Sequence, residues 1–138
     1  MLDKEVSLVN EGMDKIDESL DKAKCKTRHF IQGNHELWLD NFVTKHPYLP
    51  QYKAEVALKI KERGYKYLKY ISNKPLKIGK LNFIHGKYTP IHHAKKHLAS
   101  YKENIIYGHT HDLQRFTETG LGGTQSAWSL GCLKDMKS

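Results

Sequence analysis

Three stretches of the sequence decide the fold: FIQGNHE at residues 30–36, FIHG at residues 83–86 and IIYGHTH at residues 105–111. In each of them a short apolar run leads into a cluster of glycine and histidine, joined in the first stretch by an asparagine. A short apolar run bounded by glycine is typical of a buried strand. In an open α/β sheet, the carboxyl ends of the strands line the ligand crevice. We therefore expect the three clusters to meet at one edge of a sheet.

The side chains in these clusters are good metal ligands. The five candidates are Asn34, His35, His85, His109 and His111. Imidazole nitrogen and amide oxygen suit a borderline divalent metal such as zinc, manganese, iron or nickel. Because His109 and His111 are two residues apart, an extended backbone would turn both rings to one side. The sequence therefore predicts a divalent metal site at the edge of the sheet.

The rest of the sequence predicts a single α/β domain over residues 1–138. Apolar residues recur every three or four positions in residues 1–25, which indicates an amphipathic helix. Further helices are expected at residues 35–44, 52–63 and 90–101, where proline or glycine marks the ends. Strands are expected at residues 27–32, 65–71, 76–84 (two strands around a Gly-Lys turn), 104–107, 113–119 and 124–130.

Composition indicates a globular chain with a basic surface. The 138 residues include 23 Lys and Arg against 15 Asp and Glu, and the formal net charge of +8 favours phosphate-bearing partners. Cys25 and Cys132 are too widely separated for a CxxC zinc ribbon. No apolar run approaches the roughly 20 residues of a membrane helix, and the first residues lack the layout of a signal peptide. We therefore expect no membrane partner and a cytoplasmic location.

The glycine and histidine clusters also carry a family resemblance. In this order, GNHE at residues 33–36, HG at residues 85–86 and GHTH at residues 108–111 resemble the last three motifs of the calcineurin-like metallophosphoesterases. The likeness runs from about residue 27 to about residue 113. It implies a hydrolase, with phosphatase or phosphodiesterase activity, that depends on divalent metal.

The resemblance also implies a role for each matching residue. Asn34, His85 and His109 match positions that hold one ion of a two-metal centre, and His111 matches a ligand of the other ion. His35 matches the catalytic histidine that contacts phosphate and protonates the leaving group, so Asn34 and His35 would bind phosphate together. The implied cofactor is one or two ions of Mn, Zn, Fe, Ni or Mg. Such ions clamp phosphoryl oxygens and generate a hydroxide nucleophile.

The first two motifs of that family, Asp-x-His and Gly-Asp-x-x-Asp, do not occur in these 138 residues. Asp14 and Asp17 have a suitable spacing, but Met13 replaces the glycine, and we expect both to be solvated charges on the first helix. The implied fold is therefore a partial metallophosphoesterase-like α/β sandwich that lacks its N-terminal strands. Because the bridging carboxylate is missing, we expect the chain to bind at most one metal well and to hydrolyse phosphoesters weakly or not at all alone.

Different partners follow from different functions. A phosphoesterase would act on a phosphoester substrate, with nucleic acid among the candidates. Its open sheet edge would be filled by self-association or by a complementing N-terminal chain. The alternative function is a non-catalytic nucleic-acid-binding module that keeps the fold, in which Tyr65, Tyr67 and Tyr70 could stack bases. A strand with one buried aromatic face explains the same tyrosines. A structural zinc protein is a third alternative.

Several of these residues also have simpler structural interpretations. The glycine-flanked histidines could be ordinary turn residues, and Asn34 could cap the helix at residues 35–44. His93 and His97 are four residues apart on an expected helix, a spacing that can chelate zinc. We favour a solvated basic helix face for these two histidines, because lysines lie between them. Asp112 is likewise expected to be solvated.

Overall fold

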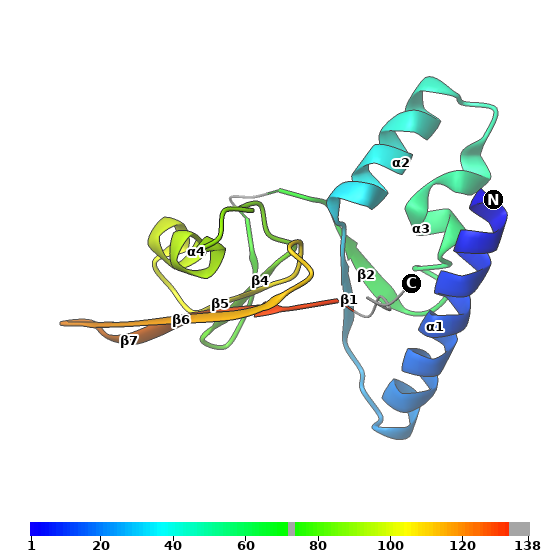
Figure 1. Ribbon diagram of the computed structural model, residues 1–138. Helices are drawn as coiled ribbons and strands as arrows, with labels where there is room; N and C mark the ends of the chain where they lie inside the picture. Colours follow the sequence, from blue (N-terminus) through cyan, green and yellow to red (C-terminus); the bar gives the residue numbers. More distant parts are fainter. Residues whose placement is uncertain (72–73, 133–138) are drawn as a thin grey trace. The chain divides into compact units, whose positions relative to one another are not determined.

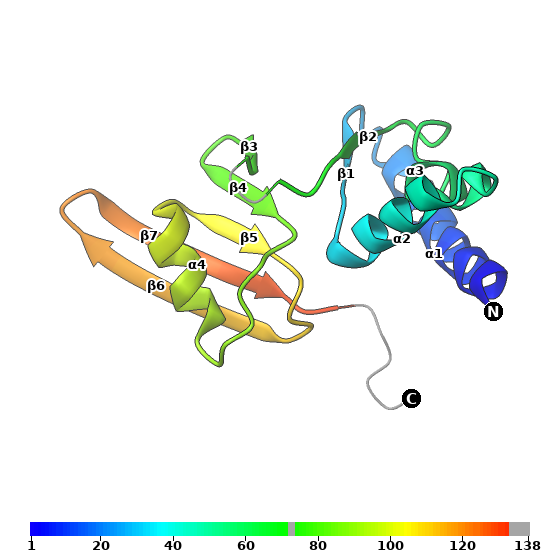
Figure 2. The same cartoon turned by 90° about the horizontal axis from the view of Figure 1, so that it is seen from above.

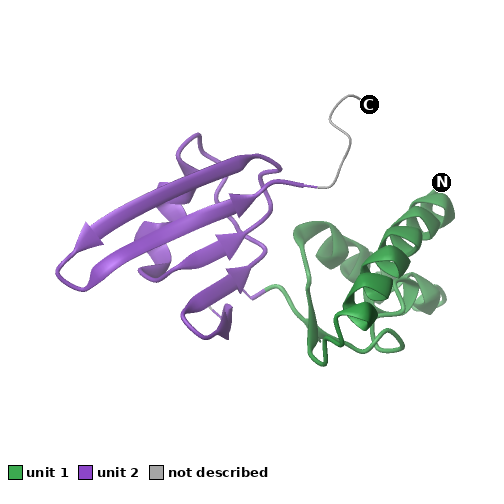
Figure 3. Cartoon of the chain, turned by 90° about the horizontal axis from the view of Figure 1, so that it is seen from below, with its two compact units in different colours: residues 1–70 green, residues 71–138 purple. Residues whose placement is uncertain are grey.

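The structure is a computed structural model that describes residues 1–71 and 74–132. The chain forms two units, unit 1 (Met1–Tyr70) and unit 2 (Ile71–Ser138), which are coloured separately in Figure 3. Helices and strands occur in both, so the α/β class is confirmed. That residues 1–138 form one domain stays a prediction. Among the described residues, no helix is long and apolar enough to cross a membrane.

Unit 1 combines helices with a small parallel sheet (Figure 1). Its elements are α1 (Leu2–Lys22), β1 (Arg28–Ile31), α2 (Asn34–Lys45), the 3-10 helix η1 (Pro50–Tyr52), α3 (Ala54–Ala57) and β2 (Tyr65–Leu68). The two strands pair in parallel, with Arg28 opposite Tyr65 and Ile31 opposite Leu68. The predicted helix at residues 1–25, the strand at 27–32, the helix at 35–44 and the strand at 65–71 are therefore present.

Arg63 fastens α1 to the rest of unit 1. Its guanidinium donates hydrogen bonds of 2.7 Å to both Asp14 and Asp17, and its Nε donates to the carbonyl oxygen of Leu58 at 2.9 Å. Desolvation alone would raise the pKa of Asp17, but the hydrogen bonds from Arg63 and Tyr65 outweigh it and hold that pKa below its ordinary value. The expectation of a solvated charge is wrong for Asp17, whose side chain is 16% exposed, whereas Asp14 is 69% exposed.

Unit 2 is a five-stranded mixed sheet with α4 lying over one face (Figure 2). Its elements are β3 (Leu76–Ile78), β4 (Leu81–Ile84), α4 (His93–Tyr101), β5 (Ile105–Tyr107), β6 (Leu113–Gly120) and β7 (Gly123–Leu130). The strand order is β3-β4-β5-β7-β6. β4, β5 and β7 are parallel, and the pairs β3–β4 and β6–β7 are antiparallel. Every strand predicted for this part of the chain is present.

The core of unit 2 lies between α4 and the sheet. Its buried members are Ile84, Ala94, Leu98, Ile105, Tyr107 and Ala127. His93 and His97 belong to the same buried side of α4, with exposed fractions of 3% and 0%. The expectation of a solvated basic face is therefore wrong for these two histidines. The helix begins at His93 rather than at Pro90 and turns both residues inward together with Ala94 and Leu98.

Residues 52–63 differ most from the prediction. The expected single helix is replaced by the 3-10 turn η1 and the one-turn helix α3. Lys59 adopts a left-handed backbone with φ 54°. The N–H of Ile60 donates to the carbonyl oxygen of Glu55 at 3.1 Å, and that of Lys59 donates to Val56 at 3.1 Å. This is the Schellman pattern that ends a helix, so the chain leaves the helical path well before Gly64.

Candidate functional site

The ends of β4 and β5 bring two of the predicted ligands together. These strands are parallel neighbours, with Ile84 opposite Tyr107, so the loops that follow them start side by side. The N–H of Gly108 donates to the carbonyl oxygen of His85 at 2.9 Å and joins the two loops. As a result, Nε2 of His85 and Nδ1 of His109 are 3.1 Å apart. With the two rings tilted by 74°, one ring nitrogen donates a hydrogen bond to the other.

The 3.1 Å separation of the two ring nitrogens is a hydrogen-bond distance, and it is also close to the spacing of two ligands on one divalent ion. Metal–nitrogen bonds of about 2.0–2.1 Å place two ligands roughly 3.3 Å apart in a tetrahedral site and about 3 Å apart in an octahedral one. The observed distance of 3.1 Å falls between these two values. Among residues 1–71 and 74–132, no group of three or more His, Cys, Asp or Glu side chains is arranged to hold a metal. The structure therefore brings the rings of His85 and His109 together, and that they bind a metal stays a prediction.

The loop that carries His109 and His111 has a strained backbone. Both residues are left-handed, with φ 66° and 63°, which costs a residue with a Cβ roughly 1–2 kcal/mol. The expectation that an extended backbone turns both rings to one side is wrong, because neither residue is extended. The side chain of His111 is exposed. Strain of this kind concentrates at functional sites.

A glycine next to His85 allows the two loops to come close. Gly86 has φ +106°, and a Cβ there would lie 3.0 Å from Cδ2 of Tyr107 and 3.2 Å from Cβ of His109. Any other residue would push against the strand end that carries His109 and would also be strained in its own backbone. The HG sequence at residues 85–86 is therefore a steric requirement of the close approach.

Asn34 and His35 lie in unit 1, at the first turn of α2. The N-cap is Gly33, whose N–H donates to Oε2 of Glu36 at 2.8 Å, so the expectation that Asn34 caps the helix is wrong. His35 is exposed, stands 5.0 Å from the ring of Trp38 and borders an open pocket of about 310 Å³ between α1, α2 and α3. A helix N-terminus favours anions. That these two residues join the unit 2 histidines in one site stays a prediction.

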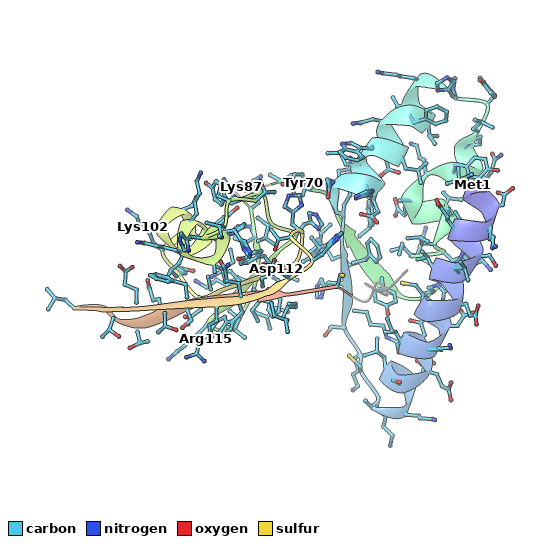
Figure 4. All side chains as sticks on the ribbon, viewed as in Figure 1. Met1, Tyr70, Lys87, Lys102, Asp112 and Arg115 are labelled. Carbon is cyan, nitrogen blue, oxygen red and sulfur yellow. The ribbon has the colours of Figure 1, made fainter. Side chains whose placement is uncertain are left out.

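Two buried histidines of α4, which sequence reasoning assigned to solvent, contact the loops that carry the pair. His97 donates from Nδ1 to the carbonyl oxygen of His93 at 2.8 Å, and its Nε2 accepts the N–H of Lys87 at 3.1 Å. Burial lowers the pKa of His97 to about 4, so this ring is neutral at pH 7. Lys87 and Asp112, one residue in each loop, are labelled in Figure 4 on the side of the sheet where α4 lies.

His93 links Tyr107 to Asp112. Desolvation and the nearby Asp112 raise the pKa of Tyr107, so its hydroxyl stays protonated and donates to Nδ1 of His93 at 2.5 Å. Nε2 of His93 then carries the hydrogen and donates to the Asp112 carboxylate at 3.0 Å. Hydrogen bonds from Thr110 and His93 lower the pKa of Asp112. The expectation of a solvated Asp112 is confirmed, because its side chain is 53% exposed, and the carboxylate also accepts a hydrogen bond from His93.

The tyrosines of β2 lie on a half-buried face. The hydroxyl of Tyr65 donates to Asp17 at 2.8 Å and that of Tyr67 donates to Asp40 at 3.0 Å. Both rings pack against the small core of unit 1, and burial raises the pKa of Tyr65 to about 12. The predicted strand is present, but its aromatic face is half-buried at these two residues rather than fully buried.

Comparison of the chain with protein-family models, with curated proteins and with solved structures gave no match. The likeness to the metallophosphoesterases therefore rests on three motifs of the sequence. Within these motifs, the side chains of His85 and His109 are in contact. Gly86 leaves room for the two loops to come close, and the N–H of Gly108 bonds one loop to the other. His111 has a left-handed backbone.

Proposed function

We propose that the chain is a metal-dependent phosphoesterase domain in which His85 and His109 bind one divalent ion. The observation that carries the proposal is the 3.1 Å separation of Nε2 of His85 and Nδ1 of His109 at the ends of two parallel strands. A shared ion would replace the hydrogen bond between the rings. The motif resemblance supplies Asn34 as a third ligand and His111 as a ligand of a second ion. The finer fold proposed is a partial metallophosphoesterase-like α/β sandwich without its N-terminal strands.

His35 would supply the proton in the reaction. It is exposed at the first turn of α2, and the N–H groups of a helix N-terminus favour the anionic oxygens of a phosphoester. A bound divalent ion polarises the phosphoryl group and lowers the pKa of a coordinated water. The phosphoester would therefore bind through Asn34 and His35, and His35 would donate its proton to the departing oxygen.

Weak activity is part of the proposal. Asn34, His85 and His109 are all neutral donors, so they provide no charge compensation for a dication. The carboxylates of Asp-x-His and Gly-Asp-x-x-Asp do not occur in the 138 residues. A complementing N-terminal chain, or a second copy, would add ligands and raise both affinity and rate. Gel filtration of the chain at high concentration tests self-association, and a well-behaved monomer would count against it.

Metal titration tests the site. The 138-residue chain is titrated with Mn²⁺ and Zn²⁺ by calorimetry and assayed with bis(p-nitrophenyl) phosphate. His85→Ala, His109→Ala and Asn34→Ala are expected to weaken binding at least tenfold, while the exposed His92→Gln leaves it unchanged. Equal binding by all variants would exclude this site. DNA binding with a steep salt dependence that chelator does not change would instead support the nucleic-acid-binding alternative. Fast hydrolysis by the isolated chain would contradict the expected weakness.

A further inference from the structure

We propose that His93 and His97 of α4 are positioning residues that hold the two loops carrying His85 and His109 in the geometry that binds metal. This inference rests on the proposed function, because it concerns the same pair of rings. Neither residue would touch the metal or the phosphoester. Their role would be to fix the direction in which Nε2 of His85 and Nδ1 of His109 point.

The first loop is held by His97. Its Nε2 accepts the backbone N–H of Lys87, two residues after His85, at 3.1 Å. The ring is completely buried and its other nitrogen is bonded to the His93 carbonyl oxygen at 2.8 Å, so the ring orientation is fixed from both ends. Fixing the ring of His97 therefore fixes the path of the backbone that leaves His85.

The second loop is held by His93. Its Nε2 donates to Asp112 at 3.0 Å, which anchors the loop immediately after His111. The same loop is tied to β7, because the hydroxyl of Ser129 donates to the carbonyl oxygen of Asp112 at 2.6 Å. With φ values of 66° and 63° at His109 and His111, this backbone would relax elsewhere if its anchors were removed.

Tyr107 connects the two anchors. Its hydroxyl donates to Nδ1 of His93, and its ring lies 3.8 Å from that of His97 in a stacked arrangement. Cδ2 of the same ring would lie 3.0 Å from a Cβ at Gly86, and Tyr107 itself directly precedes the Gly108-His109 turn. A shift of either α4 histidine is therefore passed to both loops.

Simple packing would not require these polar rings. Leucine or phenylalanine would fill the space between α4 and the sheet without buried nitrogen atoms that need partners. Each ring nitrogen of His93 and His97 has such a partner, and the bonds to Lys87 and Asp112 lead to the loops that carry His85 and His109. If these histidines only stabilised the fold, substituting them would change the free energy of unfolding and nothing else. If they position the loops, the substitutions that remove a loop contact would also weaken metal binding.

The test compares variants of the full 138-residue chain that keep or remove one contact. His97→Gln can keep an acceptor for the Lys87 N–H, and His97→Leu removes it at similar volume. Asp112→Ala releases the second loop from an exposed position, and His92→Gln is the matched control. Three quantities are measured on each: Zn²⁺ affinity, hydrogen exchange of the Lys87 amide, and the nuclear Overhauser effect between the rings of His85 and His109.

His97→Leu and Asp112→Ala are expected to weaken Zn²⁺ binding about 10- to 100-fold and to reduce the ring-to-ring effect. His97→Gln and His92→Gln should resemble the wild type, and the Lys87 amide should exchange faster only in His97→Leu. The proposal would be overturned if the His97→Leu and Asp112→Ala proteins fold, bind Zn²⁺ with wild-type affinity and keep the nuclear Overhauser effect between the two rings. If His97→Leu does not fold, Asp112→Ala decides.

The two proposals fail in distinguishable ways. Absence of Zn²⁺ binding by the wild type would refute the proposed metal site. The ring-to-ring effect between His85 and His109 would then decide the positioning role by itself. Loss of this effect in Asp112→Ala and His97→Leu, together with its retention in His97→Gln, would support the positioning role. Retention of the effect in every variant would refute it.

Discussion

Acid is expected to destabilise unit 2 through protonation of His97. In the folded chain this ring is completely buried and neutral, and burial lowers its pKa from the ordinary 6.5 to about 4. The unfolded chain takes up the proton near pH 6.5, whereas the folded chain resists it until about pH 4. The stability that depends on the neutral ring is therefore fully present above pH 6.5 and declines as the pH falls towards 4.

The size of the effect follows from the two pKa values. The interval from 6.5 to about 4 corresponds to about 3 kcal/mol at 1.36 kcal/mol per pKa unit. Roughly 2 kcal/mol of it should be lost by pH 5, where the unfolded state is almost fully protonated at this position. A domain with a typical stability of 5–15 kcal/mol would survive this loss but with a clearly lower unfolding midpoint.

Urea unfolding between pH 5 and pH 8 measures this loss. Unit 2 contains Trp128, and Trp38→Phe removes the tryptophan of unit 1, so the remaining fluorescence reports on unit 2. His97→Gln in the same background can keep the acceptor for the Lys87 N–H but cannot titrate. The difference between the two proteins cancels the other histidines and should change by about 2 kcal/mol over this range. A difference that is constant with pH would refute the reasoning.

Two further substitutions test the packing of each unit. Arg63→Ala should destabilise unit 1 by about 2 kcal/mol, because Asp17 would lose its shortest charged hydrogen bond while Tyr65 and Arg28 remain; an unchanged urea midpoint would show that the ion pair adds nothing. Gly86→Ala should destabilise unit 2 by about 2–3 kcal/mol, since its Cβ would meet Tyr107 at 3.0 Å. Gly79→Ala has open space around it and should cost only about 1 kcal/mol in thermal unfolding, so equal effects would contradict the steric argument.

The order of helices and strands could be read from the sequence because apolar spacing records it directly. The run at residues 105–107 and the alternation at residues 113–119 and 124–130 became β5, β6 and β7. The expected approach of His85 and His109 followed from one further rule, that parallel strands end at the same edge. Local pattern and sheet geometry therefore sufficed for this half of the candidate site.

Helix ends were harder to predict, because lysine takes the place that glycine usually holds. Lys24, Lys59 and Lys102 all adopt left-handed backbone beyond the ends of α1, α3 and α4, with φ between 54° and 56°. Glycine is the usual residue there, so the first glycine after α3, Gly64, gave the wrong end. The bond from Ile60 N–H to the carbonyl oxygen of Glu55 at 3.1 Å closes α3 at its C-terminal end instead.

The buried histidines were assigned to solvent because the residues between them are lysines. A different feature of the sequence indicates the inward side: His93, Ala94, His97, Leu98 and Tyr101 form a continuous helical stripe, and Lys95 and Lys96 lie outside it. Because histidine is a polar residue, the spacing of apolar residues alone does not reveal this stripe. Whether a histidine is buried depends on partners for both nitrogens, and those partners are distant in the sequence.

The charge of an ion bound at the proposed site would couple metal binding to phosphate binding. His85 and His109 contribute two neutral nitrogens, so an ion held by them keeps most of its positive charge and attracts a phosphate oxygen. Metal and phosphate should therefore strengthen each other's binding, with a coupling of about 1–3 kcal/mol that is equal in both directions. Calorimetric titration of Mn²⁺ with and without inorganic phosphate measures this coupling, and His85→Ala should abolish it. The same Mn²⁺ affinity in both conditions would mean that the pair of rings does not present its metal to a phosphoester.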